Sequence, residues 1–197
     1  RNKKLFEKLW PVDLIDESQD QVRGWFYYLL FAGYAAFGEK PYNTVCLNGW
    51  MLDEKGDKMS KSLGNVIWGA DAYSKLGADV LRLYMCFDVA PWDTQKFSFR
   101  NANEMEKALN ILWNTYMFIE TYSGSGFLKS RPARLQPEDK WLLSRVNTLT
   151  NTVTEDLENF RFHSAARNLI YFVLNDFSRW YVKIVRERVS PLYSGED

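Results

Sequence analysis

Two lysines three residues apart are the most chemically suggestive feature of the sequence. Residues 57–65 read DKMSKSLGN, with Lys58 and Lys61 separated by a methionine and a serine. A lysine ammonium is a compact charge on a flexible stem, so it can follow a phosphate that moves during a reaction. Two such charges could neutralise the charge that builds on a triphosphate attacked at its α-phosphorus, and the hydroxyls of Ser60 and Ser62 could add donors. The alternative is a solvated loop with ordinary surface lysines.

The elements before this loop predict how it is positioned. Residues 20–37 are apolar almost all round, which predicts a buried helix that stops at Gly38. Residues 44–49 (TVCLNG) predict a short strand. Residues 53–57 (DEKGD) predict a turn, in which Gly56 can adopt a positive φ. A helix followed by a strand suggests the last part of an α/β sheet domain.

The rest of the chain is predicted to be mainly helical. Apolar residues recur with a period of 3.6, and a Gly-, Ser- and Pro-containing loop lies at 123–137. We predict two short helices near 70–76 and 78–87 on either side of Gly77, a strand at 96–99, and long helices at 103–122, 138–159 and 161–189. Three consecutive amphipathic helices indicate a helical bundle. The fold class expected is therefore mainly α with a small α/β part.

Composition excludes several classes of protein. The 197 residues carry 25 basic and 25 acidic side chains, and 46% are hydrophobic, which excludes collagen-like and wholly disordered chains. The single histidine excludes a His-rich metal site. Cys46 and Cys86 make neither a disulfide framework nor a zinc site, so we expect no structural metal, and free buried thiols in a reducing, cytoplasmic compartment. The apolar run 25–37 is too short to span a membrane, which needs about 18 residues.

Two strings carry a family resemblance. The KMSKS letters at 58–62 match the signature of class I aminoacyl-tRNA synthetases. Upstream, residues 17–26 (ESQDQVRGWF) resemble the EGxDQxRGWF stretch of isoleucyl-tRNA synthetases, with Ser18 in place of the family glycine. That departure puts a close backbone approach to a ligand at this residue in doubt. The valyl family, which shares the KMSKS loop but generally lacks the DQxRGWF string, is the alternative.

The resemblance implies an aminoacyl-adenylate site around the upstream string. Asp20 and Gln21 would bind ribose hydroxyls and the aminoacyl group, and Glu17 would receive an ammonium. Trp25 would be a flat wall against a branched aliphatic side chain, with Gly24 allowing close packing. Each residue also has a structural explanation, because Asp20 is a fair helix N-cap and a tryptophan on an apolar helix commonly lies in the core.

The resemblance also implies an activity. The family uses ATP with Mg²⁺ to convert L-isoleucine to isoleucyl-adenylate and then esterifies its tRNA(Ile). Lys58 and Lys61 would stabilise the transition state. Asn48, Gly49 and the Met59 backbone would flank the adenine, so the ATP-binding set is Asn48, Gly49, Met59, Ser60 and Ser62. Enzymes of this family are a well-known example of weak discrimination between isoleucine and valine that is corrected by hydrolytic editing.

Further strings assign regions by resemblance. Residues 77–84 (GADVLRLY) are similar to the stem-contact stretch that follows the KMSKS loop, and residues 176–181 (DFSRWY) to a segment of the anticodon-binding helices of the archaeal and eukaryotic-like branch. We therefore expect the C-terminal part of a Rossmann-type catalytic domain at 1–68, a stem-contact region at 69–100, and part of an anticodon-binding helical bundle at 101–197.

A basic segment near the end of the chain predicts contact with tRNA. Residues 161–188 contain six basic and two acidic residues, a net charge of +4. Arg179, Lys183 and Arg186 share a helix face and would meet the phosphates of a tRNA stem. A solvated basic face is the alternative, and Trp180 and Tyr181 are expected in the core rather than stacked on bases.

No HIGH-type motif or editing domain is found, and His163 is interpreted as a surface or capping residue. We therefore expect a fragment that cannot activate isoleucine without the remainder of the catalytic domain, and that self-associates through residues 20–50. The alternatives are a free-standing tRNA-binding helical module and a fragment with no retained activity.

Overall fold

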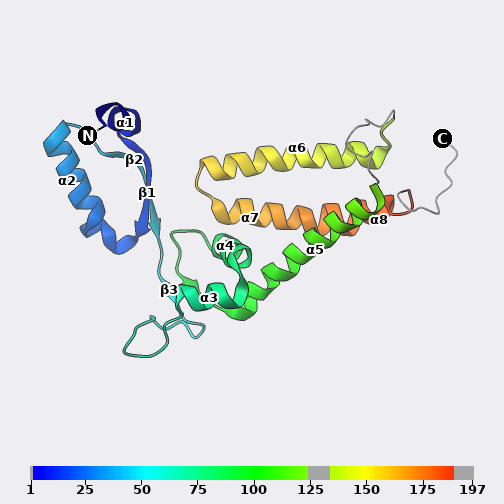
Figure 1. Ribbon diagram of the computed structural model, residues 1–197, viewed down its shortest axis with the longest axis horizontal. Helices are drawn as coiled ribbons and strands as arrows, with labels where there is room; N and C mark the ends of the chain where they lie inside the picture. Colours follow the sequence, from blue (N-terminus) through cyan, green and yellow to red (C-terminus); the bar gives the residue numbers. More distant parts are fainter. Residues whose placement is uncertain (1, 124–133, 189–197) are drawn as a thin grey trace. The chain divides into compact units, whose positions relative to one another are not determined.

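The computed structural model describes residues 2–123 and 134–188, which fold into two compact units. The first unit comprises Arg1–Ile67 and Val89–Phe97, and the second comprises Trp68–Asp88 and Ser98–Asp197. Figure 1 shows their helices and strands in chain order.

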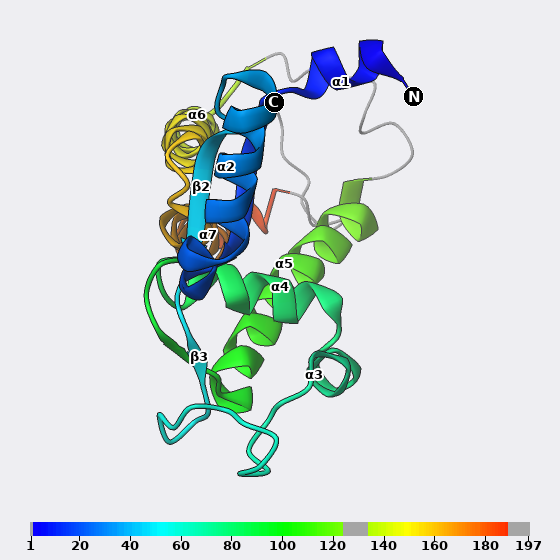
Figure 2. The same cartoon turned by 90° about the vertical axis from the view of Figure 1, so that its left-hand side faces the viewer.

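The first unit is built on two pairs of parallel strands. Its elements are α1 (Lys3–Leu9), β1 (Val12–Ser18), the 3₁₀ helix η1 (Gln19–Arg23), α2 (Trp25–Phe37), β2 (Tyr42–Asn48), β3 (Met51–Leu52) and β4 (Gln95–Lys96). β1 pairs with β2 and β3 pairs with β4, both in parallel. Parallel strands need a crossover connection, and between β1 and β2 it is supplied by η1 and α2. Figure 2 shows α2 lying along the β1–β2 pair.

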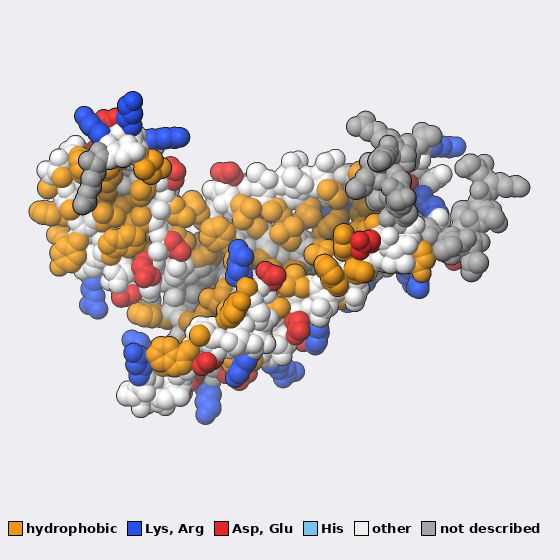
Figure 3. Space-filling view, viewed as in Figure 1, with side chains coloured by type: hydrophobic (Ala, Val, Ile, Leu, Met, Phe, Trp, Pro, Cys, Tyr) orange, Lys and Arg blue, Asp and Glu red, His pale blue; other side chains and the backbone are white. Residues whose placement is uncertain are grey.

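The helix α2 forms as predicted but is not buried all round. Only Phe26 and Gly33 are buried, and Gly33 lies against Pro41, where a Cβ would come within 2.9 Å of the proline. Phe31 and Tyr34 are 67% and 66% exposed, and Figure 3 shows hydrophobic side chains gathered over this helix. The prediction of burial was wrong, because one face of α2 packs on the strands while the other faces have no cover in the described chain. Self-association through residues 20–50 stays a prediction.

Glycines end the helices where the sequence predicts. Gly38 takes φ 75° after α2 and donates its N–H to the Tyr34 carbonyl at 2.9 Å. Gly77, with φ 76°, separates α3 (Gly69–Leu76) from α4 (Ala78–Phe87). Glycine accepts positive φ without the steric cost other residues meet, so both positions act as stops.

The second unit is helical, as expected. After α3 and α4 come α5 (Phe99–Ser123), α6 (Pro137–Glu158), α7 (Phe162–Tyr171), the π-helical segment η2 (Phe172–Val182) and α8 (Lys183–Val185). The third long helix predicted at 161–189 is therefore divided by a change of hydrogen-bond pattern. Most of the predicted loop at 123–137 and the predicted helix end at 189 lie outside the described residues.

Two buried or half-buried carboxylates hold the bundle together. Asp156, only 4% exposed near the end of α6, accepts bonds from Arg161 Nε at 2.8 Å and Asn168 Nδ2 at 3.1 Å. Asp139, at the start of α6, accepts bonds from the Tyr181 hydroxyl at 2.9 Å and from Arg188 at 2.6 Å. Buried charges need such partners, and these bonds tie α6 to the segment that follows it.

Contacts also join the short helices to the long ones. Tyr84 on α4 is 1% exposed, and its hydroxyl accepts the Ser98 N–H at 3.1 Å. The Arg167 guanidinium on α7 donates to the carbonyls of Phe87 and Asp88 at the end of α4. A cation at a helix C-terminus meets the unsatisfied carbonyls there, which fixes α4 against α7.

The two cysteines differ in environment. Cys46 is buried in β2, and burial together with the nearby Asp16 raises the pKa of its thiol to about 11. This thiol stays protonated near neutral pH. Cys86 is exposed, so its predicted burial was wrong. Among the described residues, no helix has the length and apolar character needed to cross a membrane.

The Asp139 cluster predicts a pH dependence of stability. The Arg188 guanidinium holds the pKa of Asp139 below its usual value of 3.8. A carboxyl whose pKa is lower in the folded state stabilises the fold above its unfolded pKa, and that contribution is lost as the pH falls through the folded value. We expect Asp139→Asn to lower the free energy of unfolding by about 2 kcal/mol at pH 7, and this difference from the wild type to shrink below about pH 4.

Chemical denaturation followed by circular dichroism at pH 7 and pH 3 measures both effects. Glu158→Gln, at an exposed position on α6, is the matched control and should change little at either pH. An equal loss of stability at the two pH values for Asp139→Asn would contradict the assignment.

Candidate functional site

The loop that carries the two lysines begins with a side-chain-stabilised turn. The Oδ1 atom of Asp53 accepts the N–H groups of Gly56 and Asp57 at 2.9 and 2.8 Å. Gly56 takes φ 97°, as the predicted turn requires. Hydrogen bonds lower the pKa of Asp53, with the bond from Asn65 as the largest cause. The carboxylate is therefore charged when it organises the turn.

The Asn65 carboxamide closes the same loop from its other end. Its Nδ2 donates to Asp53 Oδ2 at 2.9 Å and to the Lys58 carbonyl at 3.2 Å, and its Oδ1 accepts the Ser60 N–H at 2.9 Å. Asn65 belongs to the DKMSKSLGN string, but no role was predicted for it. The signal was present, because an asparagine side chain offers both a donor and an acceptor to nearby backbone.

Both predicted catalytic lysines lie on the surface of this closed loop. Lys58 and Lys61 are exposed, and the Lys58 ammonium lies 4.8 Å from the centre of the Trp50 ring. An exposed cation–π contact is weak, about 0.5–1 kcal/mol, so a phosphate can compete for the ammonium. Trp50 was not among the predicted residues.

The remaining predicted residues of the loop make local bonds. The Ser60 and Ser62 hydroxyls lie 3.1 Å apart, and Ser60 Oγ also accepts the Leu63 N–H at 3.2 Å. The Met59 sulfur accepts the Ile67 N–H at 3.4 Å. The two hydroxyls thus help to shape the loop and still have capacity for a ligand.

Asn48 and Gly49 lie at the end of β2 and are fixed to neighbouring chain segments. Asn48 Nδ2 donates to Asp16 Oδ1 of β1 at 2.9 Å, and the Gly49 N–H donates to the Pro91 carbonyl at 2.8 Å. A Cβ on Gly49 would lie 2.1 Å from the Asp93 carbonyl oxygen. Glycine is therefore required here by the close approach of another segment, whether or not it also borders a nucleotide.

The upstream string lies at the same edge of the strand pair. In the parallel register, Glu17 is opposite Leu47 and Ser18 opposite Asn48, so Glu17 and Asn48 both lie at the carboxyl ends of their strands. Ligands of open α/β sheets bind at such carboxyl ends. The register thus places Glu17 of the predicted adenylate set and Asn48 of the predicted ATP set at one edge.

The individual side chains of that string show how it turns from strand to helix. Glu17 accepts the Ser18 N–H at 2.8 Å. Gln21 Oε1 accepts the Trp25 N–H at 3.0 Å, and its Nε2 donates to Asp20 at 3.3 Å. The Gln21 side chain therefore accepts the first N–H of α2, whose N-cap residue is Gly24, and Asp20, predicted as an N-cap, lies inside η1.

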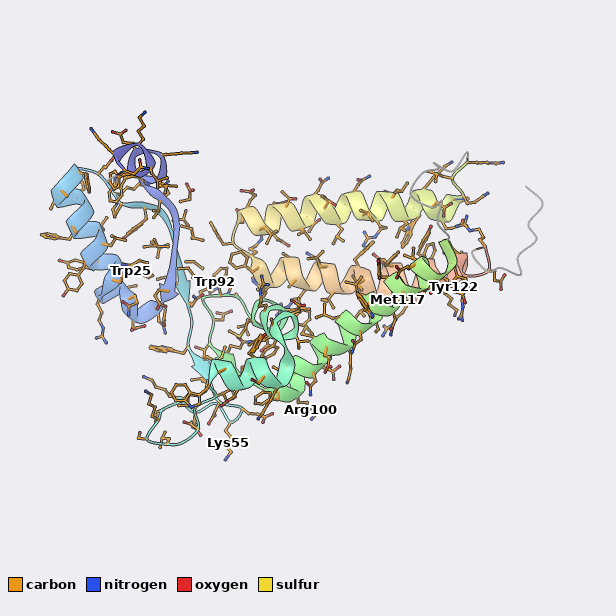
Figure 4. All side chains as sticks on the ribbon, viewed as in Figure 1. Trp25, Lys55, Trp92, Arg100, Met117 and Tyr122 are labelled. Atoms are coloured by element: carbon orange, nitrogen blue, oxygen red, sulfur yellow. The ribbon has the colours of Figure 1, made fainter. Side chains whose placement is uncertain are left out.

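Gly24 and Trp25 lie at the start of α2, and their roles at an adenylate site stay predictions. A Cβ at Gly24 would lie 2.9 Å from Gln21 Oε1, so the residue does allow close packing. Trp25 is 45% exposed and is labelled near the start of α2 in Figure 4. Its side chain is therefore partly exposed rather than enclosed in a core.

The six basic residues of 161–188 separate into two groups. Arg161 and Arg188 form ion pairs with acids of α6, and Arg167 binds carbonyls of α4. The other three are the predicted tRNA-binding residues Arg179, Lys183 and Arg186. All three are exposed, and none of them forms an ion pair with another residue of 2–123 or 134–188.

The aromatic neighbours of these residues have structural roles. The Trp180 and Trp141 ring centres are 4.0 Å apart, and Trp180 is 42% exposed. Burial and the bond to Asp139 raise the pKa of Tyr181 to about 12. His163 is half-buried in α7 rather than on the surface. No group of three His, Cys, Asp or Glu side chains suited to a metal ion occurs in the part of the chain that the structure describes.

Two protein-family models match this chain, one over its N-terminal part and one over its C-terminal helices. The family model of class I tRNA synthetases for isoleucine, leucine, methionine and valine matches residues 1–97, and the model of the anticodon-binding domain of tRNA ligases matches residues 139–194. The chain therefore belongs to the class I aminoacyl-tRNA synthetases.

The relatives narrow this class. The chain is 44% identical over 196 residues to an isoleucine–tRNA ligase of Thermococcus kodakarensis and 45% identical over 204 residues to one of Pyrococcus abyssi, covering 96% and 100% of the chain. Within the class, the chain is thus homologous to isoleucine–tRNA ligases along nearly its whole length. It spans 18% and 19% of the length of these two relatives.

Solved structures share the fold. A Mycobacterium tuberculosis methionyl-tRNA synthetase bound by methionyl-adenylate aligns with a TM-score of 0.80 at 20% identity, over 99% of this chain and 38% of that one. A leucyl-tRNA synthetase of Agrobacterium radiobacter, in a ternary complex with tRNA and LeuAMS, aligns with a TM-score of 0.72 at 19% identity, over 96% of this chain and 25% of that one.

Proposed function

We propose that the chain supplies the signature loop and part of the anticodon-binding helices of an isoleucine–tRNA ligase. In the reaction, a carboxylate oxygen of L-isoleucine attacks the α-phosphorus of ATP, pyrophosphate leaves, and the aminoacyl group is then transferred to tRNA(Ile). The observation that carries the proposal is the closed loop that presents Lys58 and Lys61 to solvent, in a unit whose β1 and β2 strands end at a common edge.

The two lysines would act by electrostatic stabilisation. Negative charge moves onto the leaving pyrophosphate as its bond to the α-phosphorus breaks, and ammonium groups placed there in advance stabilise that charge. The contact of Lys58 with Trp50 gives that lysine a resting position from which it can move to the phosphates. ATP enters as its Mg²⁺ complex, so the metal belongs to the substrate.

The amino acid would bind beside Trp25. Its exposed indole gives an apolar surface suited to a branched aliphatic side chain, and Glu17 at the end of β1 can receive the substrate ammonium. Valine is the alternative amino acid, since it differs by a single methylene, worth about 1–3 kcal/mol in such a pocket. The names of the relatives support isoleucine.

Lys61→Ala tests the catalytic assignment. The chain replaces its aligned segment in the Pyrococcus abyssi ligase, and isoleucine-dependent ATP–pyrophosphate exchange is measured. We expect Lys61→Ala to lower the exchange kcat by about a hundredfold, because one preorganised charge contact to the transition state is lost.

Lys55→Ala removes another exposed lysine, one that points away from the ribbon of the neighbouring turn (Figure 4), and should leave kcat unchanged. A chimera with no exchange activity, or one in which Lys61→Ala retains full activity, would overturn the proposed function.

A second candidate function is tRNA binding by the helical bundle itself. It rests on three exposed basic residues, Arg179, Lys183 and Arg186. Their neighbours on the same segment are engaged in tertiary contacts, whereas these three are presented to solvent. Exposed lysine and arginine side chains can neutralise the phosphates of a nucleic acid and release the counterions bound to it.

The salt dependence of tRNA binding tests this function in the 197-residue chain. Replacing the three residues by alanine should lower the magnitude of the slope of log K against log salt by about 2–3, because about 0.7–0.9 is expected for each lost phosphate contact. The triple alanine variant of Lys3, Lys4 and Lys8 removes three exposed charges from α1 and should leave the slope unchanged. Equal slopes for the wild type and both variants would contradict the assignment.

A further inference from the structure

The Asn65 side chain forms hydrogen bonds to three different residues of the loop. It bonds to Asp53, twelve residues earlier, to the Lys58 carbonyl and to the Ser60 N–H. Asp53 in turn binds the amides of Gly56 and Asp57 with its other oxygen. One carboxamide and one carboxylate therefore close residues 53–65 into a ring of hydrogen bonds.

Two of the three bonds hold the backbone on either side of Met59. The carbonyl of Lys58 and the N–H of Ser60 are both fixed to the same carboxamide, so the peptide units that border Met59 keep a set orientation. Lys61 comes directly after Ser60. The backbone positions from which the two ammonium groups extend are thus set, while the flexible lysine stems can still follow a phosphate.

The bond to Asp53 is the strongest of the three in kind, because its acceptor is an ionised carboxylate. The lowered pKa of Asp53 agrees with this state. Asp53 is anchored next to β3, and Leu52 also forms an antiparallel bridge to Lys58. The ring of hydrogen bonds is therefore connected to β3 at two points, through Asp53 and through the bridge between Leu52 and Lys58.

We propose that Asn65 is a positioning residue for the phosphate-binding loop: through Asp53, the Lys58 carbonyl and the Ser60 N–H, it holds the loop in the shape that aims Lys58 and Lys61 at the triphosphate. This inference rests on the proposed function for its reaction, but it concerns a residue whose three bonds are all to the loop itself. Misplacement of a catalytic group by about 1 Å can cost a hundredfold in rate.

The experiment uses the Pyrococcus abyssi chimera with four variants. Asn65→Ala removes all three bonds. Asn65→Asp places a carboxylate against Asp53, and Asp53→Asn places an amide against the amide of Asn65. The double variant that combines Asp53→Asn with Asn65→Asp exchanges donor and acceptor, so it restores the link between the two side chains and keeps the acceptor for the Ser60 N–H. It does not restore the bond to the Lys58 carbonyl, because a carboxylate has no donor.

We expect Asn65→Ala to lower the exchange kcat by about tenfold to a hundredfold, with KM for isoleucine within about twofold of the wild type. Each single polar variant should lose at least about tenfold, and the double variant should be more active than both of its single parents, as a direct pairwise interaction requires. Asn151→Ala, an exposed asparagine of α6, is the control and should match the wild type.

Two outcomes would overturn the positioning role. One is an unchanged kcat in Asn65→Ala, with or without a fall in melting temperature. The other is a double variant that is no better than its single parents. Failure of the proposed function is distinguished by Lys61→Ala, because full activity of that variant would contradict the catalytic role assigned to Lys61, whatever the result at Asn65.

Discussion

Parallel pairing of β1 with β2 is the constraint on which the arrangement of the first unit depends. It sets Ser18 opposite Asn48, and the Asn48–Asp16 bond at 2.9 Å holds this register at the strand ends. A shift by one residue would turn every side chain of a strand to the opposite face. Glu17 and Ser18 end β1 and Asn48 ends β2, so a single pairing brings together two parts of the chain that are separated by the whole of α2.

Some basic residues of the last helices form ion pairs that stabilise the fold, and others are exposed to solvent. A chain with zero net charge still places Arg161 and Arg188 on buried or half-buried carboxylates, while Arg179 and Lys183 remain exposed. Loss of Arg161 or Arg188 leaves a poorly solvated carboxylate without its partner, which is costly. Loss of Arg179 or Lys183 costs the fold little, so these are the residues available to contact a polyanion.

Local sequence predicts the parts of this structure that local chemistry determines. Gly38 and Gly77 stop helices because only glycine accepts their φ without cost, and the DEKGD turn follows from Asp53 and Gly56. Tertiary features could not be predicted in the same way. The open face of α2 depends on what lies beside it, and the bond from Asn65 to Asp53 joins residues twelve positions apart, which no periodicity reveals.

Side-chain hydrogen bonds within the chain, rather than a bound nucleotide, give the lysine loop its shape. Amide hydrogen exchange at Ser60 tests this directly in the ligand-free 197-residue chain, because its N–H donates to Asn65. We expect this amide to exchange at least about tenfold more slowly than in an unfolded peptide, and we expect Asn65→Ala to abolish the protection while Asn151→Ala preserves it. Exchange of Ser60 at the unprotected rate in the wild-type chain would contradict the claim.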